Sequence, residues 1–260
     1  MAKYFFVFLL FIFQGCSEYS LVVKSDDYSK KFEVANKLYD KENYIKASTL
    51  YEQVYQRNPK SGEGELSYYR LGVSYFKMED YYMAAYYLAS FSDKYPNSSK
   101  CEETSFLNAI CAVKNAPKTS LDQSDTQVAL NELQLFIYKY PNSPKLDTCN
   151  QIMDNLRLKL ENKDFETVKL YDKTQNFKSA VVVAETFLKD FPQSKTREKV
   201  WEILLRNSYL LAFNSIEDKK KERIDKTIER YSKFVLEFPQ SIYKNELDSY
   251  IDRLKMVQVK

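Results

Sequence analysis

Apolar residues recur along this chain with the period of an α-helix, in five blocks that each end at a proline. Positions 15, 12, 8, 5 and 1 before each proline are mostly apolar or small, and this spacing places them on one face of a helix. The residue 12 positions before the proline is alanine in four blocks, which suits the close approach of a neighbouring helix. Proline cannot continue a helix, so each block predicts one helix and its C-terminal end. The prolines are Pro59, Pro96, Pro141, Pro192 and Pro239.

A second amphipathic segment precedes the helix of the second block. It reads Tyr68-x-x-Leu71-Gly72-x-x-Tyr75, and followed by alanine and proline it resembles the tetratricopeptide repeat, a pair of antiparallel helices. Only a minimal side chain fits where two helices cross, so we expect Gly72 to face Ala84 across this pair. Successive prolines lie 37, 45, 51 and 47 residues apart, against about 34 in that repeat. Extra residues must therefore extend the later helices or lie between them.

The predicted fold is an all-α tetratricopeptide-repeat solenoid of about five helix hairpins. Apolar residues at 247, 250, 251, 254 and 257 predict a C-terminal capping helix over 245–258, which covers the last open face of the solenoid. We assign the repeat domain to residues 29–260. Its repeats are expected at about 29–59, 66–96, 101–141, 146–192 and 197–239.

The N-terminus has the pattern of a bacterial lipoprotein leader. A short basic start precedes an unbroken apolar run of ten residues, Tyr4–Phe13, about half the length that spans a bilayer. Gly15 stands directly before Cys16, and this pair at the end of an apolar run resembles the lipoprotein cleavage box. We therefore predict a signal peptide over 1–15 and acyl chains such as palmitate on Cys16; an ordinary secretory cleavage near that residue is the alternative. The polar segment 16–28 is expected to be an irregular tether.

Composition excludes several functional classes. Lys and Arg number 39 against 36 Asp and Glu, and this near balance lacks the basic excess of a nucleic-acid binder. The chain has no histidine and only four glycines, so it lacks a histidine base, a histidine metal ligand and the glycines of a phosphate-binding loop. We expect no enzyme activity, no metal and no cofactor. The run Lys219–Lys221 is expected to be a solvated loop rather than a phosphate or lipid site, and Cys101, Cys111 and Cys149 are expected to be free buried thiols.

Three further segments narrow the resemblance to one family of tetratricopeptide-repeat proteins. They are Leu121-Asp122-Gln123-x-x-Thr126 in an insertion within the third repeat, Asp80-Tyr81-Tyr82-x-Ala84, and a long helix expected from Leu156 into the following one. Together with the cleavage box they resemble the BamD family of outer-membrane lipoproteins, and the aromatic-rich repeats resemble its Bacteroidetes branch. The resemblance implies a non-enzymatic scaffold of the β-barrel assembly machinery, anchored in the outer membrane and facing the periplasm. In that family the C-terminal repeats bind BamA, the barrel-forming protein, and the N-terminal repeats receive unfolded outer-membrane proteins. A periplasmic adaptor for cell-wall or division proteins is the alternative.

The resemblance also predicts where a peptide binds. In a tetratricopeptide unit the first helix lines the concave groove. Its first groove-facing position is the residue after the core aromatic, and the next two lie four and seven residues beyond that position. In the first two units this selects Phe32, Asn36, Tyr39, Tyr69, Val73 and Phe76. Rings at these positions would grip apolar side chains while Asn36 bonds the peptide backbone; alternatively, the groove is narrow and the rings pack on one another. A clamp for a terminal carboxylate is disfavoured, because it needs several Lys or Arg side chains that face into the groove, and we expect only Lys77 and Arg70 near it.

Overall fold

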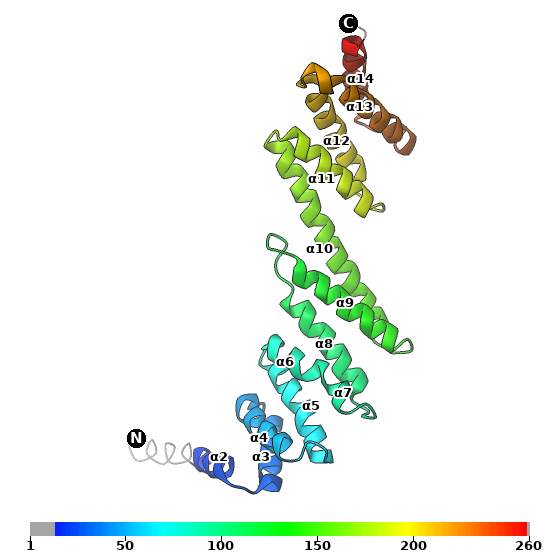
Figure 1. Ribbon diagram of the computed structural model, residues 1–260. Coiled ribbons are helices and arrows are strands. Elements are labelled where there is room, and N and C mark those ends of the chain that lie inside the picture. The colour runs from blue at the N-terminus through cyan, green and yellow to red at the C-terminus, as the bar shows by residue number, and fades with distance from the viewer. Residues whose placement is uncertain (1–13, 259–260) are drawn as a thin grey trace, which may run out of the picture. The chain divides into compact units, whose positions relative to one another are not determined.

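The structure is a computed structural model that describes residues 14–258; residues 1–13, which hold most of the predicted signal peptide, lie outside the described part. Regular structure across 14–258 is helical throughout (Figure 1). None of the described helices combines the length and apolarity needed to cross a bilayer. The helices are α2 (Gln14–Lys24), α3 (Tyr28–Asp40), α4 (Tyr44–Arg57), α5 (Gly62–Lys77), α6 (Tyr81–Ala89), α7 (Phe91–Lys94), α8 (Cys101–Asn115), α9 (Ser124–Lys139), α10 (Leu146–Lys173), α11 (Phe177–Asp190), α12 (Arg197–Phe213), α13 (Glu217–Glu237) and α14 (Lys244–Gln258).

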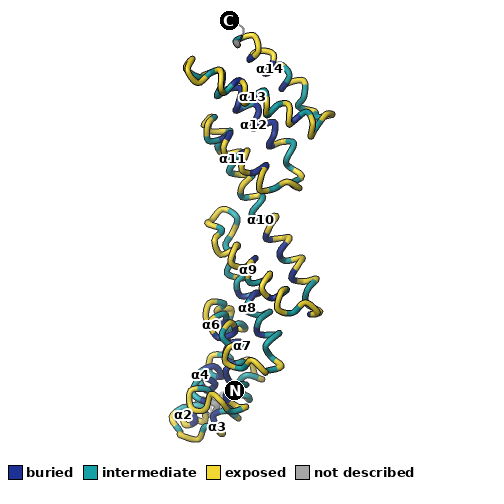
Figure 2. The backbone as a smooth tube through the Cα atoms, turned by 45° about the vertical axis from the view of Figure 1, so that its right-hand side comes forward, coloured by how far each residue is buried: buried dark blue, intermediate teal, exposed yellow. Residues whose placement is uncertain are grey.

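The helices pack as consecutive antiparallel hairpins, which confirms the all-α tetratricopeptide-repeat fold. In the first part of the chain α3 pairs with α4, α5 with α6 and α8 with α9, and α4 also packs on α5, so that the hairpins stack. In the last part α11 packs on α12 and α12 on α13. Buried positions alternate with exposed ones along the helices (Figure 2). The contacts divide the chain into two compact units, Met1–Met153 and Asp154–Lys260.

The tight turns between paired helices share one geometry in three repeats. Glu42, Glu79 and Gln175 have φ angles of 58°, 61° and 56°, in the left-handed region that side chains rarely adopt. An Asn or Asp follows each of them and caps the next helix, as when the Asp80 carboxylate accepts the N–H of Met83 at 3.1 Å. The equivalent caps are Asn43 and Asn176.

The third repeat has the predicted insertion, a loop over 116–123 between α8 and α9. The Gln123 side chain organises it: Nε2 donates to the carbonyls of Lys118 and Leu121 at 2.9 and 2.8 Å, and Oε1 accepts from Thr126 Oγ1 at 2.8 Å. The Gln-x-x-Thr part of the sequence motif is therefore the hydrogen-bonded anchor of this loop.

The serine two residues after the proline ties the two ends of a repeat together. Ser143 Oγ donates to Glu102 at 2.6 Å and accepts the N–H of Lys145 at 3.2 Å. Glu102 lies in the first turn of α8, whereas Ser143 follows the C-terminus of α9. The same bond recurs between Ser98 and Glu65 at 2.6 Å and between Ser194 and Glu161 at 2.7 Å.

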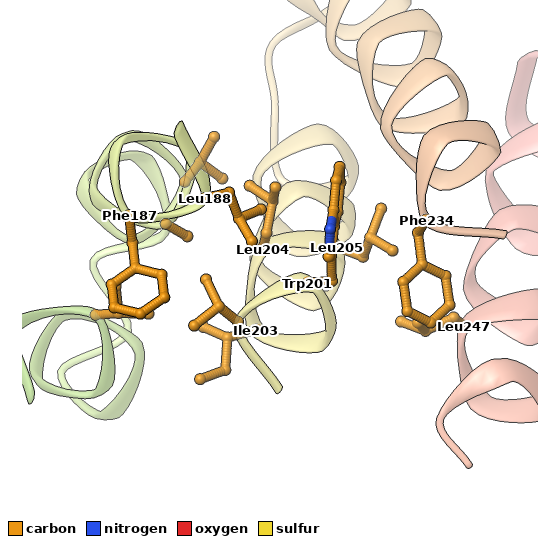
Figure 3. Close-up of a cluster of buried hydrophobic side chains, with 12 residues drawn as sticks. Phe187, Leu188, Trp201, Ile203, Leu204, Leu205, Phe234 and Leu247 are labelled. Carbon is orange, nitrogen blue, oxygen red and sulfur yellow. The ribbon is translucent and has the colours of Figure 1, made fainter. Parts of the chain in front are cut away.

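The core of the second unit joins five helices, α10 to α14, through aromatic and aliphatic side chains (Figure 3). Phe187 of α11, Trp201 of α12 and Phe234 of α13 contribute rings, and Leu247 of α14 covers the end of this cluster. Since α14 packs on both α12 and α13 and buries Leu247, it has the role of the predicted capping helix.

The segment that we expected to be an irregular tether is partly helical. Residues Gln14–Lys24 form α2, and Val22 in its last turn is buried against the first repeat, with Tyr19 partly buried beside it. The expectation for residues 16–28 is therefore wrong over α2, because a few apolar side chains give this polar segment a packing face.

Two other expectations need correction. A Cβ added to Gly72 would lie 3.0 Å from the Leu88 side chain and 3.2 Å from Tyr87 Cβ, so the glycine faces the turn of α6 that follows Ala84. The lysines of Lys219–Lys221 lie in the first turns of α13 and not in a loop. Favourable charges in this segment, with Glu217 at its start, allow the helix to begin earlier than the apolar pattern indicates.

Candidate peptide-binding site

The predicted peptide-binding residues lie on α3 and α5, the first helices of the first two repeats. On each helix they follow one another at intervals of four and three residues and share a face. Phe32, Asn36, Tyr39, Tyr69 and Phe76 are partly exposed. Val73 is only 6% exposed and packs with Ala84, Leu88 and Cys111 in a core cluster. A buried side chain cannot contact a bound peptide, so we withdraw Val73 from the site.

Arg70 connects α3 to α5 at the centre of this surface. Its Nη1 donates to Asn36 Oδ1 at 2.7 Å and to the Tyr51 hydroxyl at 3.1 Å. The Tyr51 hydroxyl also donates to Asn36 Oδ1, at 2.8 Å. The guanidinium lies 4.9 Å from the centroid of the Tyr39 ring, within the range of a cation–π contact. Asn36 thus uses its carbonyl oxygen inside the protein, and among residues 14–258 its Nδ2 has no hydrogen-bond acceptor.

Each aromatic ring of the site packs on another ring, but that partner is not one of the predicted site residues. The narrow-groove alternative instead has the site rings packing on one another. The pairs are Phe32–Tyr51 and Tyr39–Tyr51 with centroids 6.5 and 6.1 Å apart, Tyr69–Phe91 at 6.1 Å, and Phe76–Tyr81 at 5.6 Å. Tyr51 and Phe91 are fully buried. The partly exposed rings are therefore held by the core, which lowers the entropy that a bound ligand would have to remove.

Burial keeps the tyrosines of the site neutral. It raises the pKa of Tyr51 to about 12 against the opposing effect of Arg70, and it raises the pKa of Tyr39 as well. Burial and then a hydrogen bond with the Glu103 carboxylate raise the pKa of Tyr69. Arg70 has no carboxylate partner among the ion pairs of the described residues. The surface is thus a set of neutral rings with the Arg70 guanidinium beside Tyr39. At Tyr69 it also includes the Glu103 carboxylate and Lys100, whose Nζ lies 5.0 Å from the ring centroid.

Sequence reasoning named Arg70 only as a nearby basic residue and missed its role. The missing information is the distance between α3 and α5, because Asn36 and Arg70 are 34 residues apart in the chain. Tyr51 stands eight residues before Pro59, at one of the predicted core positions. Its hydroxyl links the core to the surface through Asn36 and Arg70. Helical periodicity in the sequence cannot predict a hydrogen-bond network that connects two repeats.

Three of the four cysteines have side chains that the structure describes. Cys101, Cys111 and Cys149 are free, and the last two are buried as expected. The expectation of burial is wrong for Cys101, which is half-buried at the N-terminus of α8. Cys16, the predicted lipidation site, falls within α2, but its side chain lies outside the described part. Within the described residues, no group of three or more Cys, Asp and Glu side chains is placed to hold a metal ion.

The sequence matches the profile of a family described as YfiO, outer membrane lipoprotein, over residues 24–223 and again over 171–257. The chain belongs to the YfiO family. The two matched ranges together run through all of the helix hairpins, from α3 to α14. A search of curated proteins finds no significant match.

Two solved structures align with most of this YfiO-family chain. Both are crystal structures of a kinesin light chain from Podosopora anserina with nearly identical TPR-like repeats, and one of them is of a variant with a methionine in place of a glutamine. Each is 13% identical with a TM-score of 0.34; the aligned parts cover 82% of this chain and 96% of the variant's chain, and 84% and 100% for the other.

Proposed function

We propose that this protein is a non-catalytic scaffold for the assembly of outer-membrane proteins, and that it binds extended polypeptide through the aromatic site of its first two repeats. The aromatic site comprises Phe32, Asn36, Tyr39, Tyr69 and Phe76. The observation that carries the proposal is that Phe32, Tyr39 and Tyr69 pack on the buried rings of Tyr51 and Phe91. Arg70 holds Asn36 by a hydrogen bond, and Phe76 packs on Tyr81. Membership of the YfiO family supplies the cellular setting.

The chemistry of the aromatic site suits an unfolded polypeptide with apolar and aromatic side chains. Tyrosine and phenylalanine rings offer a large contact area and lose little conformational entropy on binding, because each has only two side-chain torsions. Asn36 Nδ2 would donate to a carbonyl of the bound backbone, since its Oδ1 already accepts from Arg70 and Tyr51. Binding through area and one backbone bond is tolerant of sequence, as a protein that receives many unfolded clients requires.

The anchor and the second partner follow from the family resemblance. Cleavage before Cys16 and acylation of that cysteine would hold the protein at the outer membrane with its repeats in the periplasm; several acyl chains make such an anchor stable. A BamA-like barrel-assembly protein would bind the C-terminal repeats. Separate sites for the client and for this partner would allow one scaffold to bring them together.

A pull-down from detergent-solubilised native membranes tests the proposed assembly role. The full-length protein carries a small C-terminal affinity tag, and co-purified proteins are identified by mass spectrometry. We expect a BamA-like barrel protein in amounts comparable to the bait. Recovery of cell-wall or division enzymes in its place would favour the adaptor alternative and contradict the assembly role.

A further inference from the structure

A cavity of about 300 Å³ lies within the second unit, between α11, α12 and α13. Its lining is strongly basic, with Ser208 and Thr227 as buried hydroxyl-bearing residues. The charged residues of the lining are Lys178 from α11 and Lys219, Glu222, Arg223, Lys226 and Arg230 from α13.

The four cations of α13 converge because of their spacing. Lys219, Arg223, Lys226 and Arg230 follow one another at intervals of four, three and four residues, which places them on one face of a helix. In a loop, as the sequence first suggested, Lys219 would not share a face with the other three. Folding of Glu217–Glu237 as one helix therefore creates the basic lining.

The carboxylates near this cavity neutralise only part of the charge. Glu185 pairs with Arg230 at 2.8 Å, and Glu222 pairs with Lys226 at 2.6 Å. Lys226, followed by Arg223 and Lys219, lowers the pKa of Glu222, so its charge is already engaged by this face. Among the described residues, three cations of the lining make no ion pair: Lys178, Lys219 and Arg223.

Hydroxyl groups hold the two guanidinium groups in place. Arg223 Nη1 donates to Ser215 Oγ at 2.5 Å, and Arg230 Nη1 donates to Ser208 Oγ at 3.3 Å. Ser208 is 1% exposed, so the second of these bonds is anchored in the core. A guanidinium fixed by one nitrogen keeps further N–H donors in a planar fork that matches the oxygens of a phosphate.

We propose that this cavity is a binding site for a phosphate-bearing ligand. A phosphate group offers several acceptor oxygens and up to about two negative charges in a compact volume. It therefore neutralises the three unpaired cations better than a single carboxylate does. The source of the phosphate is either a free phosphate compound or the headgroup of an anionic phospholipid. This inference does not depend on the aromatic site, which lies in the other unit.

Isothermal titration calorimetry on the protein purified from native membranes in a non-ionic detergent tests the proposal at constant ionic strength. The ligands are inorganic phosphate, glycerophosphoglycerol as the soluble headgroup of phosphatidylglycerol, and hexaglutamate. The test variant is Lys219→Gln with Arg223→Gln. The control is Lys220→Gln with Lys233→Gln, which removes the same charge from α13 at lysines that pair with Glu217 and Glu229.

We expect one of the two phosphate ligands to bind the wild type and the control equally, and the test variant to bind it at least about tenfold more weakly. Tighter binding of inorganic phosphate assigns the site to a free phosphate compound, and tighter binding of glycerophosphoglycerol assigns it to a lipid headgroup. Equal binding by test and control variants, no binding of either phosphate, or tighter binding of hexaglutamate would overturn the proposal. Thermal melting of both variants verifies that a loss of affinity is not a loss of fold.

Discussion

Arg70 Nη1 donates to Asn36 Oδ1 at 2.7 Å and thereby joins the first helices of the first two repeats. Two tyrosines support this bond. The Tyr39 ring packs against the Arg70 guanidinium, and the Tyr51 hydroxyl is hydrogen-bonded to both Arg70 and Asn36. Residues from separate repeats therefore form one surface with fixed spacing. This is the property that a peptide-binding site built on two helices needs.

Gly64 has a strict steric requirement that Gly62, two residues earlier in the same helix, does not have. A Cβ on Gly64 would lie 2.1 Å from the carbonyl oxygen of Asn58, whereas nothing lies within 4 Å of a Cβ on Gly62. Gly64→Ala should lower the free energy of unfolding by roughly 1–3 kcal/mol or more. Gly62→Ala should leave it unchanged or raise it by up to about 1 kcal/mol. Urea denaturation measures both, and equal stabilities would contradict the packing of this turn.

The Ser143–Glu102 bond should contribute to the stability of the third repeat. Ser143→Ala removes the donor from a half-buried carboxylate and should cost roughly 1–3 kcal/mol, the range for leaving a buried polar group unsatisfied. Ser241 occupies the same turn position but has only a backbone contact, to the N–H of Tyr243, so Ser241→Ala is the matched control. Chemical denaturation should show the larger loss for Ser143→Ala; the reverse order would exclude a stabilising role for the serine–glutamate pair.

The buried thiols should be unreactive in the folded protein. Burial raises the pKa of Cys111 to about 12 and also raises the pKa of Cys149, so both remain protonated well above neutral pH. In a Cys16→Ser background at pH 8, we expect iodoacetamide to modify Cys101 first and the other two only after denaturation. Mass spectrometry of the peptides gives the order. Rapid modification of Cys111 in native protein would show that its cluster opens.

Cys16 should carry the membrane anchor. Cys16→Ser should block lipoprotein processing, so the leader stays on and the acyl chains are lost. Mass spectrometry of the wild-type N-terminus should find acyl chains on Cys16 as the first residue. A cleaved wild-type chain without acyl groups would support the ordinary secretory alternative.

The repeat hairpins were predictable because their signals are local. Helical periodicity and a terminating proline lie within one block of sequence, so the C-terminal ends of α9 at Lys139 and α11 at Asp190 follow directly from Pro141 and Pro192. Helix α2 was not predictable in the same way, because Val22 becomes a core residue only when the first repeat is present to cover it.

The aromatic site was predictable in position but not in its interactions. Repeat phase placed Tyr39 and Tyr69 correctly on α3 and α5. It did not show that Val73 is buried in the cluster that also contains Cys111 of α8, because burial depends on how closely the next hairpin packs. Nor did it show that Arg70 bonds Asn36, which requires the distance between two helices.

Binding of an aromatic-ended peptide to the aromatic site tests the central claim most directly. Fluorescence anisotropy would compare wild type, Tyr69→Ala with Phe76→Ala, and a control in which Tyr82→Ala is combined with Tyr138→Ala. The control tyrosines belong to the same unit and are 70% and 83% exposed, so their loss should not disturb the core. Arg70→Gln is a further variant that leaves every ring in place and so separates binding from packing.

We expect the double variant of the site to lose roughly 2–4 kcal/mol of binding free energy, which is about 30-fold or more in Kd. Arg70→Gln should also weaken binding, the control should bind like wild type, and recovery of a BamA-like partner through the distant repeats should be unchanged. If the site variants fold and bind the peptide as tightly as the wild type and the control, the claim that the first two repeats hold the client is contradicted.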